Sequence, residues 1–510
     1  MKHVHLLVFA AAFTVAGLSG CGSSNEGGSG GAAPTGGSSG SGGAGTGGAT
    51  GSGGSGPGGA HSGGVTGSGG QASGGSASGG SATGGSASGG SGSGGSATGG
   101  SASGGSAPGG SPGSGSGSGG AGGGGTATGG AGGAPGAGGA PGAGGSGSCS
   151  DACPAPSGGV TIGCKKRFMY GVNFAWSSDA GQANFGTDFG GFSMWSKSGV
   201  AASKAARTTD MTDMKNNGAD VVRWWMFPQL YGEAILLDGT KTPTGVGGTL
   251  LDDIKAALDI AAQLDLHVKL TLFSFDSFWN DFQVSGVTFP SLKPIATDDA
   301  KRAALVSKVV VPIAKAVEAS PNKDRLISWD VINEPEWSIT GQDPYGDQAF
   351  DPTMTGSDGR TMGTVTFAQM ETFVKDVVTA LHANSSAPVT VGSAAVKWAK
   401  AWSKVGLDYY DFHWYGWVDQ YYPHTKKPSD YGVSDKPVVV GEFPLVPASD
   451  TSGTMFGGIT YGKLLDDWLA AGYAGAQGWA FSESMGAFSW TNGKANVKAW
   501  QTAHACYTHY

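Results

Sequence analysis

Eight short runs of β-branched and apolar residues alternate with amphipathic segments between positions 168 and 481, and this alternation restricts the possible folds. Segments such as 250–261 and 367–377 repeat apolar residues at spacings of three and four, which predicts helices between the strands. The runs expected to form strands are 168–173, 220–225, 267–273, 326–333, 389–393, 410–413, 438–442 and 476–481. Eight β/α repeats in one domain predict an α/β fold, the closed (β/α)8 TIM barrel, with its functional face at the carboxyl ends of the strands.

Positions 1–148 have a composition that cannot contribute to such a barrel. A short cationic start, Met1-Lys2-His3, precedes an apolar run at 6–17, which is shorter than the roughly 20 residues needed to cross a bilayer. Leu18-Ser19-Gly20-Cys21 follows at once, and residues 1–20 resemble the signal peptide of bacterial lipoproteins. The resemblance implies cleavage before Cys21 and a lipid on its sulfur that anchors the protein to a membrane. An ordinary secretory signal with an incidental cysteine is the alternative, and both interpretations predict export.

Residues 21–148 are expected to form a disordered linker. This segment contains most of the 98 glycines of the chain together with Ser, Ala and Thr, and its one charged residue is Glu26. So few apolar side chains cannot bury a core, and the irregular repeats lack the strict three-residue period of collagen. A Gly-rich coil of this length spans on the order of 60 Å, which would hold a domain clear of a membrane surface.

Residues 149–510 remain as one large domain, and its cysteines lie near its two ends. Cys149, Cys153, Cys164 and Cys506 form an even set, which predicts two disulfides in an exported protein. The sequence leaves three pairings open, although a bridge from the amino-terminal segment to Cys506 would tie both ends of the fold together. A zinc site is the competing interpretation, but the cysteines do not form close pairs at both ends.

Two short carboxylate motifs accompany predicted strands of this domain. Glu334 lies in Asn333-Glu334-Pro335 after the fourth strand, and Glu442 lies in Gly441-Glu442-Phe443 at the end of the seventh. Both side chains would project into one mouth of a parallel barrel. Hydrolysis of a glycosidic bond needs such a pair, an acid that protonates the departing oxygen and a carboxylate that attacks the anomeric carbon. Arg223, on an earlier strand, would favour the anionic form of the second carboxylate, whereas the first must keep its proton.

These motifs resemble those of clan A glycoside hydrolases, particularly glycoside hydrolase family 5, over residues 167–500. The resemblance implies that Glu334 is the acid/base and Glu442 the nucleophile of a retaining mechanism. It also implies that Asn333 binds the sugar 2-hydroxyl and that Arg223 steadies the nucleophile. It further implies that His413 and Tyr415 line the cleaving subsite and that Trp479 stacks beneath the sugar. The chain departs from the family in its third strand, KLTLFSFDSFW, which lacks the usual His and leaves the exact family and the substrate open.

Aromatic residues and charge narrow the substrate class. Tryptophans near predicted strand ends, including Trp337 and Trp414, are candidates for stacking on the apolar faces of sugar rings. The formal net charge of −8 argues against a nucleic acid or another polyanion and favours a neutral polysaccharide.

The combined expectation is a monomeric, exported glycosidase that uses no cofactor and no metal. It would act within chains of β-1,4-mannan or β-1,4-glucan, from a lipid anchor at the cell surface or outer membrane or after release from it. A non-catalytic glycan-binding adhesin is one alternative, but an adhesin has no need of both carboxylates and Arg223. A transglycosylase would keep the same site, so only its products would distinguish it.

Overall fold

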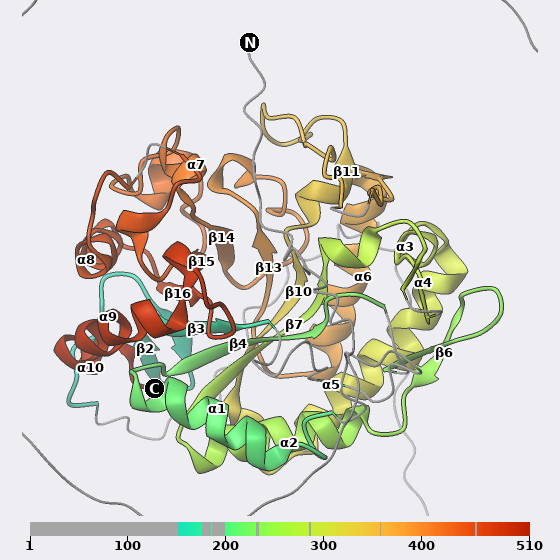
Figure 1. Cartoon of the computed structure of the whole chain (residues 1–510). Helices are drawn as coiled ribbons and strands as arrows, with labels where there is room; N and C mark the ends of the chain where they lie inside the picture. The colour runs from blue at the N-terminus through green and yellow to red at the C-terminus, as the bar shows by residue number, and fades with distance from the viewer. Residues whose placement is uncertain are drawn as a thin grey trace, which may run out of the picture. The chain divides into compact units, whose positions relative to one another are not determined.

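The computed structural model describes residues 151–175, 185, 199–230, 234–284, 287–356, 359–453 and 456–510. The predictions for the signal peptide, Cys21, the linker and Cys149 fall outside these residues. Eight parallel strands close into a barrel in the order β10-β13-β14-β15-β16-β3-β4-β7, and helices surround it (Figure 1). The predicted (β/α)8 barrel is therefore confirmed.

The barrel strands agree closely with the predicted runs. In chain order they are β3 (Met169–Phe174), β4 (Val221–Phe227), β7 (His267–Ser274), β10 (Leu326–Asn333), β13 (Val389–Ser393), β14 (Tyr410–His413), β15 (Val438–Pro444) and β16 (Gly475–Trp479). Short two-stranded sheets lie outside the barrel: β1 (Val160–Ile162) with β2 (Lys165–Arg167), β5 (Ile235–Leu237) with β6 (Pro243–Val246), β8 (Phe282–Val284) with β9 (Val287–Phe289), and β11 (Ile339–Thr340) with β12 (Val365–Thr366).

Helices of very different length connect these strands. They are α1 (Lys204–Asn216), α2 (Leu250–Gln263), α3 (Lys293–Thr297), α4 (Asp299–Leu305), α5 (Val311–Glu318), α6 (Phe367–Asn384), α7 (Gly416–Asp419), α8 (Tyr461–Ala471), α9 (Trp490–Ala503) and α10 (Ala505–Thr508). Both segments with the predicted three-and-four apolar spacing are helical, and their apolar residues are buried except for Leu251, which is partly buried. A capping box between Thr366 and Gln369 begins α6, so two of its first backbone donors are satisfied.

Two strand ends differ from the predicted ones. β15 continues through Phe443 to Pro444, so Glu442 lies inside the strand and does not end it. The strand tolerates Pro444 because it is the last residue, where a missing N–H costs little. Shifts in register against both neighbours accompany this stretch, between Phe412 and His413 on β14 and between Val440 and Phe443 on β15. β16 ends at Trp479, before a cis peptide bond to Ala480.

The two ends of the barrel are built from different residues. At the amino end, the first residues of several strands form a small separate apolar cluster, which consists of Val160, Met169, Val221, Ile327, Tyr409, Val439 and Ala474. Towards the carboxyl end the buried interior becomes polar, with Arg223, Lys269, Asp330 and Asp411. The barrel is thus plugged by apolar side chains at one end and lined by charges towards the other.

The first and last described segments of the domain lie together at the amino end of the barrel. The disulfide Cys153–Cys506 joins the first described segment to α10, and Cys164 is also disulfide-bonded. The Phe168 amide donates to the Tyr507 carbonyl at 2.7 Å, and the carboxyl terminus lies beside β2 and α10 (Figure 1). The prediction that a bridge to Cys506 ties both ends of the domain together is confirmed.

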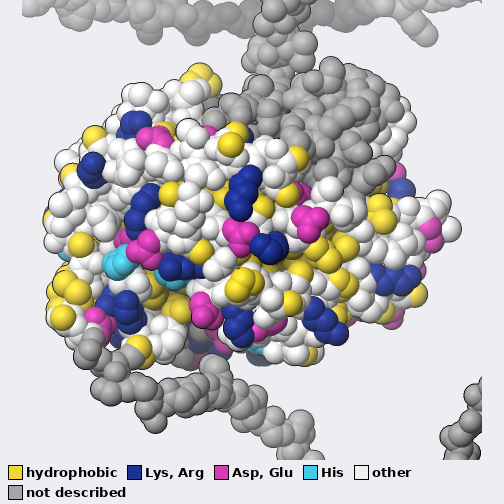
Figure 2. Space-filling view, turned by 90° about the horizontal axis from the view of Figure 1, so that it is seen from below, with side chains coloured by type: hydrophobic (Ala, Val, Ile, Leu, Met, Phe, Trp, Pro, Cys, Tyr) yellow, Lys and Arg dark blue, Asp and Glu magenta, His cyan; other side chains and the backbone are white. Residues whose placement is uncertain are grey.

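The surface mixes charges of both signs. On the face turned to the viewer in Figure 2, Lys and Arg side chains lie among Asp and Glu side chains and are not gathered in one field. Within the part of the chain that the structure describes, no helix has both the length and the apolar character needed to cross a bilayer.

Candidate active site

Glu334 leaves the end of β10 through a tight turn. Its backbone is left-handed, with φ 48° and ψ 49°, a conformation that a residue with a Cβ adopts only under constraint. Pro335 then begins the 3-10 turn η4 (Pro335–Ser338), and its fixed φ is suited to that position. The Glu334 amide donates to the Gly392 carbonyl of β13 at 2.6 Å, which holds the turn against the neighbouring strand.

Glu442 approaches the same point from β15 and is surrounded by donors. The Arg223 guanidinium donates to its Oε1 at 2.6 Å, and the Tyr415 hydroxyl donates to its Oε2 at 2.7 Å. Both are charge-assisted hydrogen bonds, which are stronger than neutral ones and favour the carboxylate anion. The predicted partnership of Arg223 with this carboxylate is present in the structure.

Arg223 is itself held by a network that sequence reasoning missed. Its Nε and Nη2 donate to Asp330 Oδ2 at 3.0 and 2.7 Å, and its two terminal nitrogens donate to Asn173 and Asn333 at 2.8 Å each. Because the guanidinium is fully buried and all of its contacts are fixed, it presents a preorganised cation to Glu442. An acidic residue at 330 within a strand predicted to be buried was a signal that could have revealed this partner.

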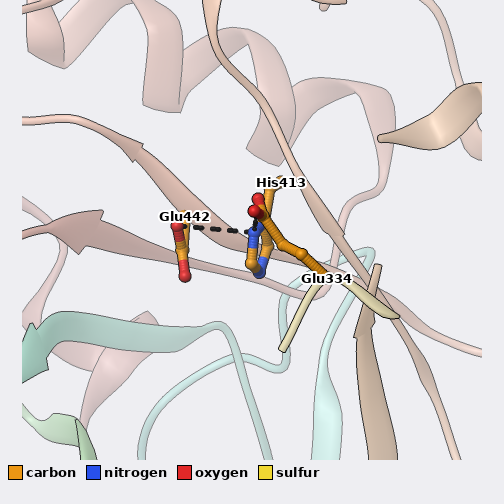
Figure 3. A group of neighbouring side chains, drawn as sticks. All are labelled: Glu334, His413 and Glu442. Carbon is orange, nitrogen blue, oxygen red and sulfur yellow. Dashed lines mark hydrogen bonds and ion pairs between the residues drawn. The ribbon is translucent and has the colours of Figure 1, made fainter. Parts of the chain in front are cut away.

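Glu334 has a different set of neighbours. The Trp337 indole N–H donates to its Oε2 at 2.9 Å, and His413 Nδ1 lies 2.7 Å from its Oε1. Figure 3 shows that Glu334 and Glu442 approach His413 from opposite sides. His413 Nδ1 is also 3.4 Å from Glu442 Oε2, so the imidazole lies between the two carboxyl groups.

These surroundings set the protonation states of the pair. Burial and then the charge of Glu442 raise the pKa of Glu334 well above its ordinary value. Burial also raises the pKa of Glu442, to about 7, but Arg223 and the Tyr415 hydroxyl oppose that rise. Burial and the charge of Arg223 hold the pKa of His413 well below its usual range, so the imidazole is neutral. The proton of the pair therefore stays on Glu334, and Glu442 is the first to ionise.

The separation of the two carboxyl groups bears on their chemistry. One oxygen of Glu334, one of Glu442 and a ring nitrogen of His413 all lie within 4.8 Å of one another. Retaining glycosidases place the two carboxyl groups roughly 5 to 5.5 Å apart, whereas inverting enzymes leave roughly 6.5 to 9.5 Å for a water molecule. Because an oxygen of each carboxyl group lies within 4.8 Å of one on the other, the geometry favours the retaining arrangement over the inverting one.

The same three side chains offer ligand atoms that a metal ion could bind. A cation there would face the guanidinium of Arg223, which already neutralises Glu442 at 2.6 Å. A second positive charge beside the same carboxylate would be repelled by the guanidinium, so the cluster is better suited to proton transfer than to metal binding.

The remaining predicted site residues differ in how they contact the two carboxylates. Asn333, His413, Tyr415 and Trp337 all lie within the hydrogen-bonded cluster around the two carboxylates. Trp479 is only partly buried, and its ring lies 5.4 Å from that of Trp225. Trp337 is almost fully buried, so it serves the site as a hydrogen-bond donor and not as an open stacking platform.

Trp414 does not lie in the substrate groove, contrary to prediction. Its side chain is fully buried, packs against Trp468 and Tyr473, and donates from the indole N–H to Asp419 at 3.2 Å. Successive residues of a strand point to opposite faces, so the residue after His413 points away from the barrel interior. A ring in that position cannot stack on a sugar.

A second charged layer lies beneath the carboxylates. Lys269 of β7 forms an ion pair with Asp411 of β14, and its ammonium also donates to Gln477 at 3.3 Å. Gly441 is required beside this layer, because a Cβ at that position would collide with the Asp411 carboxylate. The glycine in the Gly441-Glu442-Phe443 motif therefore has a packing reason that the sequence alone did not reveal.

The fold and the paired carboxylates define the geometry of a retaining glycosidase, and comparisons with known proteins agree with it. No protein-family model matches the chain. A mannan endo-1,4-beta-mannosidase of Cryptopygus antarcticus is 26% identical over 361 residues, which cover 65% of this chain and 85% of that protein. A protein of the same name from Mytilus edulis is 26% identical over 351 residues, which cover 64% of this chain and 85% of that protein.

Solved structures show the same fold. A beta-1,4-mannanase from the sea hare Aplysia kurodai superposes with a TM-score of 0.52 at 21% identity, covering 70% of this chain and 99% of that one. The beta-mannanase from the blue mussel Mytilus edulis gives a TM-score of 0.51 at 21% identity, covering 70% of this chain and 97% of that one. At this level of identity the likeness establishes the barrel fold.

Proposed function

We propose that this protein is a retaining β-glycoside hydrolase that cleaves internal linkages of β-1,4-mannan. One observation carries the proposal: two buried carboxylates, with an oxygen of each within 4.8 Å of the other group, have opposite surroundings, because Arg223 and Tyr415 donate to Glu442 and neither donates to Glu334. Structural packing alone does not require such a pair, because burying two carboxyl groups together is unfavourable.

The reaction begins with attack by Glu442 on the anomeric carbon. The carboxylate forms a glycosyl ester, and the bond to the leaving oxygen breaks as Glu334 transfers its proton to that oxygen. The hydrogen bonds from Arg223 and Tyr415 to Glu442 weaken as its charge is lost. Glu334, now a carboxylate, takes a proton from water, the water oxygen attacks the anomeric carbon, and Glu442 leaves as an anion. The configuration of the sugar is inverted twice and therefore retained.

Mannan is the favoured substrate because both similar curated proteins are named for endo cleavage of mannan. β-1,4-Glucan is the second candidate, since the two sugars differ only in configuration at carbon 2, the carbon whose hydroxyl Asn333 is expected to contact. No distance in the site distinguishes these two sugars, so the choice between them rests on the relatives.

The test is a substrate screen of the full chain with product analysis. We expect mannan and glucomannan to be cut into a ladder of oligosaccharides, faster than carboxymethyl cellulose, xylan or β-1,3-glucan. Proton NMR of the earliest products should show the β-anomer first. An α-anomer as the first product would contradict retention, and faster cleavage of cellulose would contradict the mannan assignment. Binding without cleavage would favour the adhesin, and products longer than the substrate would favour a transglycosylase.

We propose further that the domain is exported and held to a membrane by a lipid on Cys21. The lipoprotein-like residues 1–20 support this location, and so does the Cys153–Cys506 disulfide, because such bonds persist mainly in oxidising compartments. Cys21→Ser should move the protein from the membrane fraction to the soluble fraction without altering its specific activity, since residues 21–148 are expected to act as a spacer. Retention of that variant on membranes would contradict the anchor.

A further inference from the structure

A third buried glutamate lies two residues after Glu334, and the mechanism above does not use it. Glu336 is fully buried, and three hydrogen bonds converge on its carboxylate. Ser393 Oγ and the Trp402 indole N–H donate to Oε1 at 2.6 Å each, and the Ala394 amide donates to Oε2 at 3.0 Å. All three donors belong to the end of β13 or to the chain that follows it.

These contacts fix the turn that carries the acid/base. Glu336 lies within η4, so its three hydrogen bonds tie the turn to the carboxyl end of β13. On the other side of Pro335, the Glu334 amide is tied to Gly392 of the same strand. Glu334 is thus held between two attachments, which together keep its backbone in the left-handed conformation that it would otherwise leave.

The donors favour an ionised carboxylate at this position. The Trp402 indole N–H and the Ala394 amide can only donate, and they address different oxygens of Glu336. A glutamine has one acceptor oxygen, so its amide would set an N–H₂ group against one of these donors. Burial raises the pKa of Glu336, and the hydrogen bonds from Ser393, Trp402 and Ala394 oppose that rise.

We propose that Glu336 is a positioning residue for Glu334, which it holds in the orientation that reaches the leaving-group oxygen. This inference rests on the proposed glycosidase function. The charge of Glu336 has a second effect, because it adds to burial and to the charge of Glu442 in raising the pKa of Glu334. The other charged or titratable groups that face the two side chains are Arg223, His413 and, on the side of Glu336, Lys397.

The test compares Glu336→Gln with the native full chain on aryl β-mannobiosides that differ in leaving group. A poor leaving group needs the proton of Glu334, whereas dinitrophenolate does not. General acid catalysis contributes roughly 10² to 10⁴-fold, so a misplaced acid should lower kcat/KM by about 10-fold or more with the poor leaving group. With the dinitrophenyl substrate, kcat/KM should change little. The alkaline limb of the pH profile should also move to lower pH, because Glu334 loses the influence of a neighbouring anion.

Two further variants separate position from charge and from stability. Glu336→Asp keeps the charge but shortens the side chain, so the alkaline limb should stay in place while the leaving-group dependence appears. Glu318→Gln is the matched control: that carboxylate accepts hydrogen bonds from Ser386 and Lys323 just before the amino end of β13. It should lower Tm without changing either readout.

Equal loss with good and poor leaving groups, together with an unmoved alkaline limb, would overturn the inference and leave Glu336 a purely structural residue. Native-like kinetics in Glu336→Gln would overturn it as well. If Glu336→Gln does not fold, the leaving-group dependence of Glu336→Asp decides the question. A native chain without glycosidase activity would instead refute the proposed function, so the two failures can be told apart.

Discussion

The amino and carboxyl ends of the barrel use the same kinds of residue for opposite purposes. At the amino end, Asp220 is buried, but the neighbouring His509 and Lys215 outweigh that burial and lower its pKa. At the carboxyl end, burial prevails, and the pKa of Glu442 rises although Arg223 lies 2.6 Å away. Carboxylates at the first end are paired so that they stay ionised, whereas those at the second are poised to exchange a proton.

The difference explains where stability and reactivity reside. Grouping Glu334, Glu442 and Glu336 in a buried region is unfavourable for folding, because each charge must be withdrawn from water. The amino end offsets such a cost with an apolar plug, a disulfide and ion pairs. Changes at the carboxyl end should therefore alter catalysis, and changes at the amino end should alter stability.

The largest effect is expected from the catalytic pair. Glu442→Ala should lower kcat on the order of 10⁴-fold or more, because no covalent intermediate can form. Azide should enter the vacated space and yield a glycosyl azide of inverted configuration. Glu334→Ala should still react with an activated aryl glycoside, and azide should then give a product of retained configuration because Glu442 remains the nucleophile.

NMR of the two azide products checks these assignments. Exchanged stereochemical outcomes would mean that the acid and the nucleophile are assigned the wrong way round. Full activity in both variants would show that neither carboxylate takes part in the reaction. The contrast between the two ends of the barrel would then not hold.

The disulfide at the amino end should affect stability alone. Cys153 and Cys506 are separated by 353 positions, so their bond constrains the unfolded chain strongly. Replacing both by Ser should lower the free energy of unfolding by about 2 to 5 kcal/mol while kcat and KM at 25 °C stay unchanged. Denaturant titration and steady-state kinetics on the same preparation measure both quantities. A fall in kcat without loss of stability would contradict the assignment of stability to the amino end and catalysis to the carboxyl end.

A smaller effect is expected when Tyr415 loses its hydroxyl. Tyr415→Phe removes a donor that opposes the rise in the pKa of Glu442, so that pKa should rise above about 7. The acidic limb of the kcat/KM profile should move to higher pH, with about a 10-fold loss on the acidic side, which corresponds to one charge-assisted hydrogen bond.

The matched control for this variant is Tyr410→Phe, at the start of β14, the strand that precedes Tyr415. The Tyr410 hydroxyl donates to Asp435 at 3.2 Å and does not contact either catalytic carboxylate. Its pH profile should equal that of the native chain. An acidic limb that stays in place in Tyr415→Phe would show that Arg223 alone controls the ionisation of Glu442.

The smallest effect is expected at His509, which lies 3.5 Å from Asp220 and 3.3 Å from Asp265. Both carboxyl groups have a lowered pKa in the folded protein. Their contribution to stability is therefore present above their unfolded pKa of about 4 and is lost as pH falls through the lower folded pKa. His509→Gln should cost less than about 1 kcal/mol at pH 6, because the His509 side chain is exposed and solvent screens its interactions.

Urea titrations of His509→Gln and the native chain between pH 2 and pH 7 test this expectation. The difference in stability should shrink as the pH falls below the unfolded pKa of about 4 and through the lower folded pKa values, because both carboxyl groups then lose their charge. A difference that persists there would mean that His509 contributes by packing and not by charge.

The strand pattern and the two carboxylate motifs were sufficient to predict the barrel and both glutamates. β10, β13 and β14 begin and end at the predicted residues, because their β-branched and apolar runs are bounded by turn residues or by the motifs themselves. The prediction for Trp414 was wrong because the side to which a strand residue points depends on its register in the barrel.

Long-range contacts account for what the sequence did not reveal. The Arg223 partner Asp330 is 107 positions away, and Ser393, which donates to Glu336, is 57 positions from it. Nothing local distinguishes Glu336 from an exposed glutamate in a turn. Its burial follows from the packing of η4 against the chain after β13.

The sequence by itself determined the fold class and predicted the place of the proposed reaction and its two carboxylates, because periodicity and turn residues act over a few positions. The resemblance already assigned the proton to Glu334, and only the tertiary structure gave the physical reason for that choice. That choice depends on the burial of both groups, on Arg223 and Tyr415 beside Glu442, and on the neighbours of Glu334. Burial and distance between charges arise only when eight strands close on one another, so no local pattern can specify them.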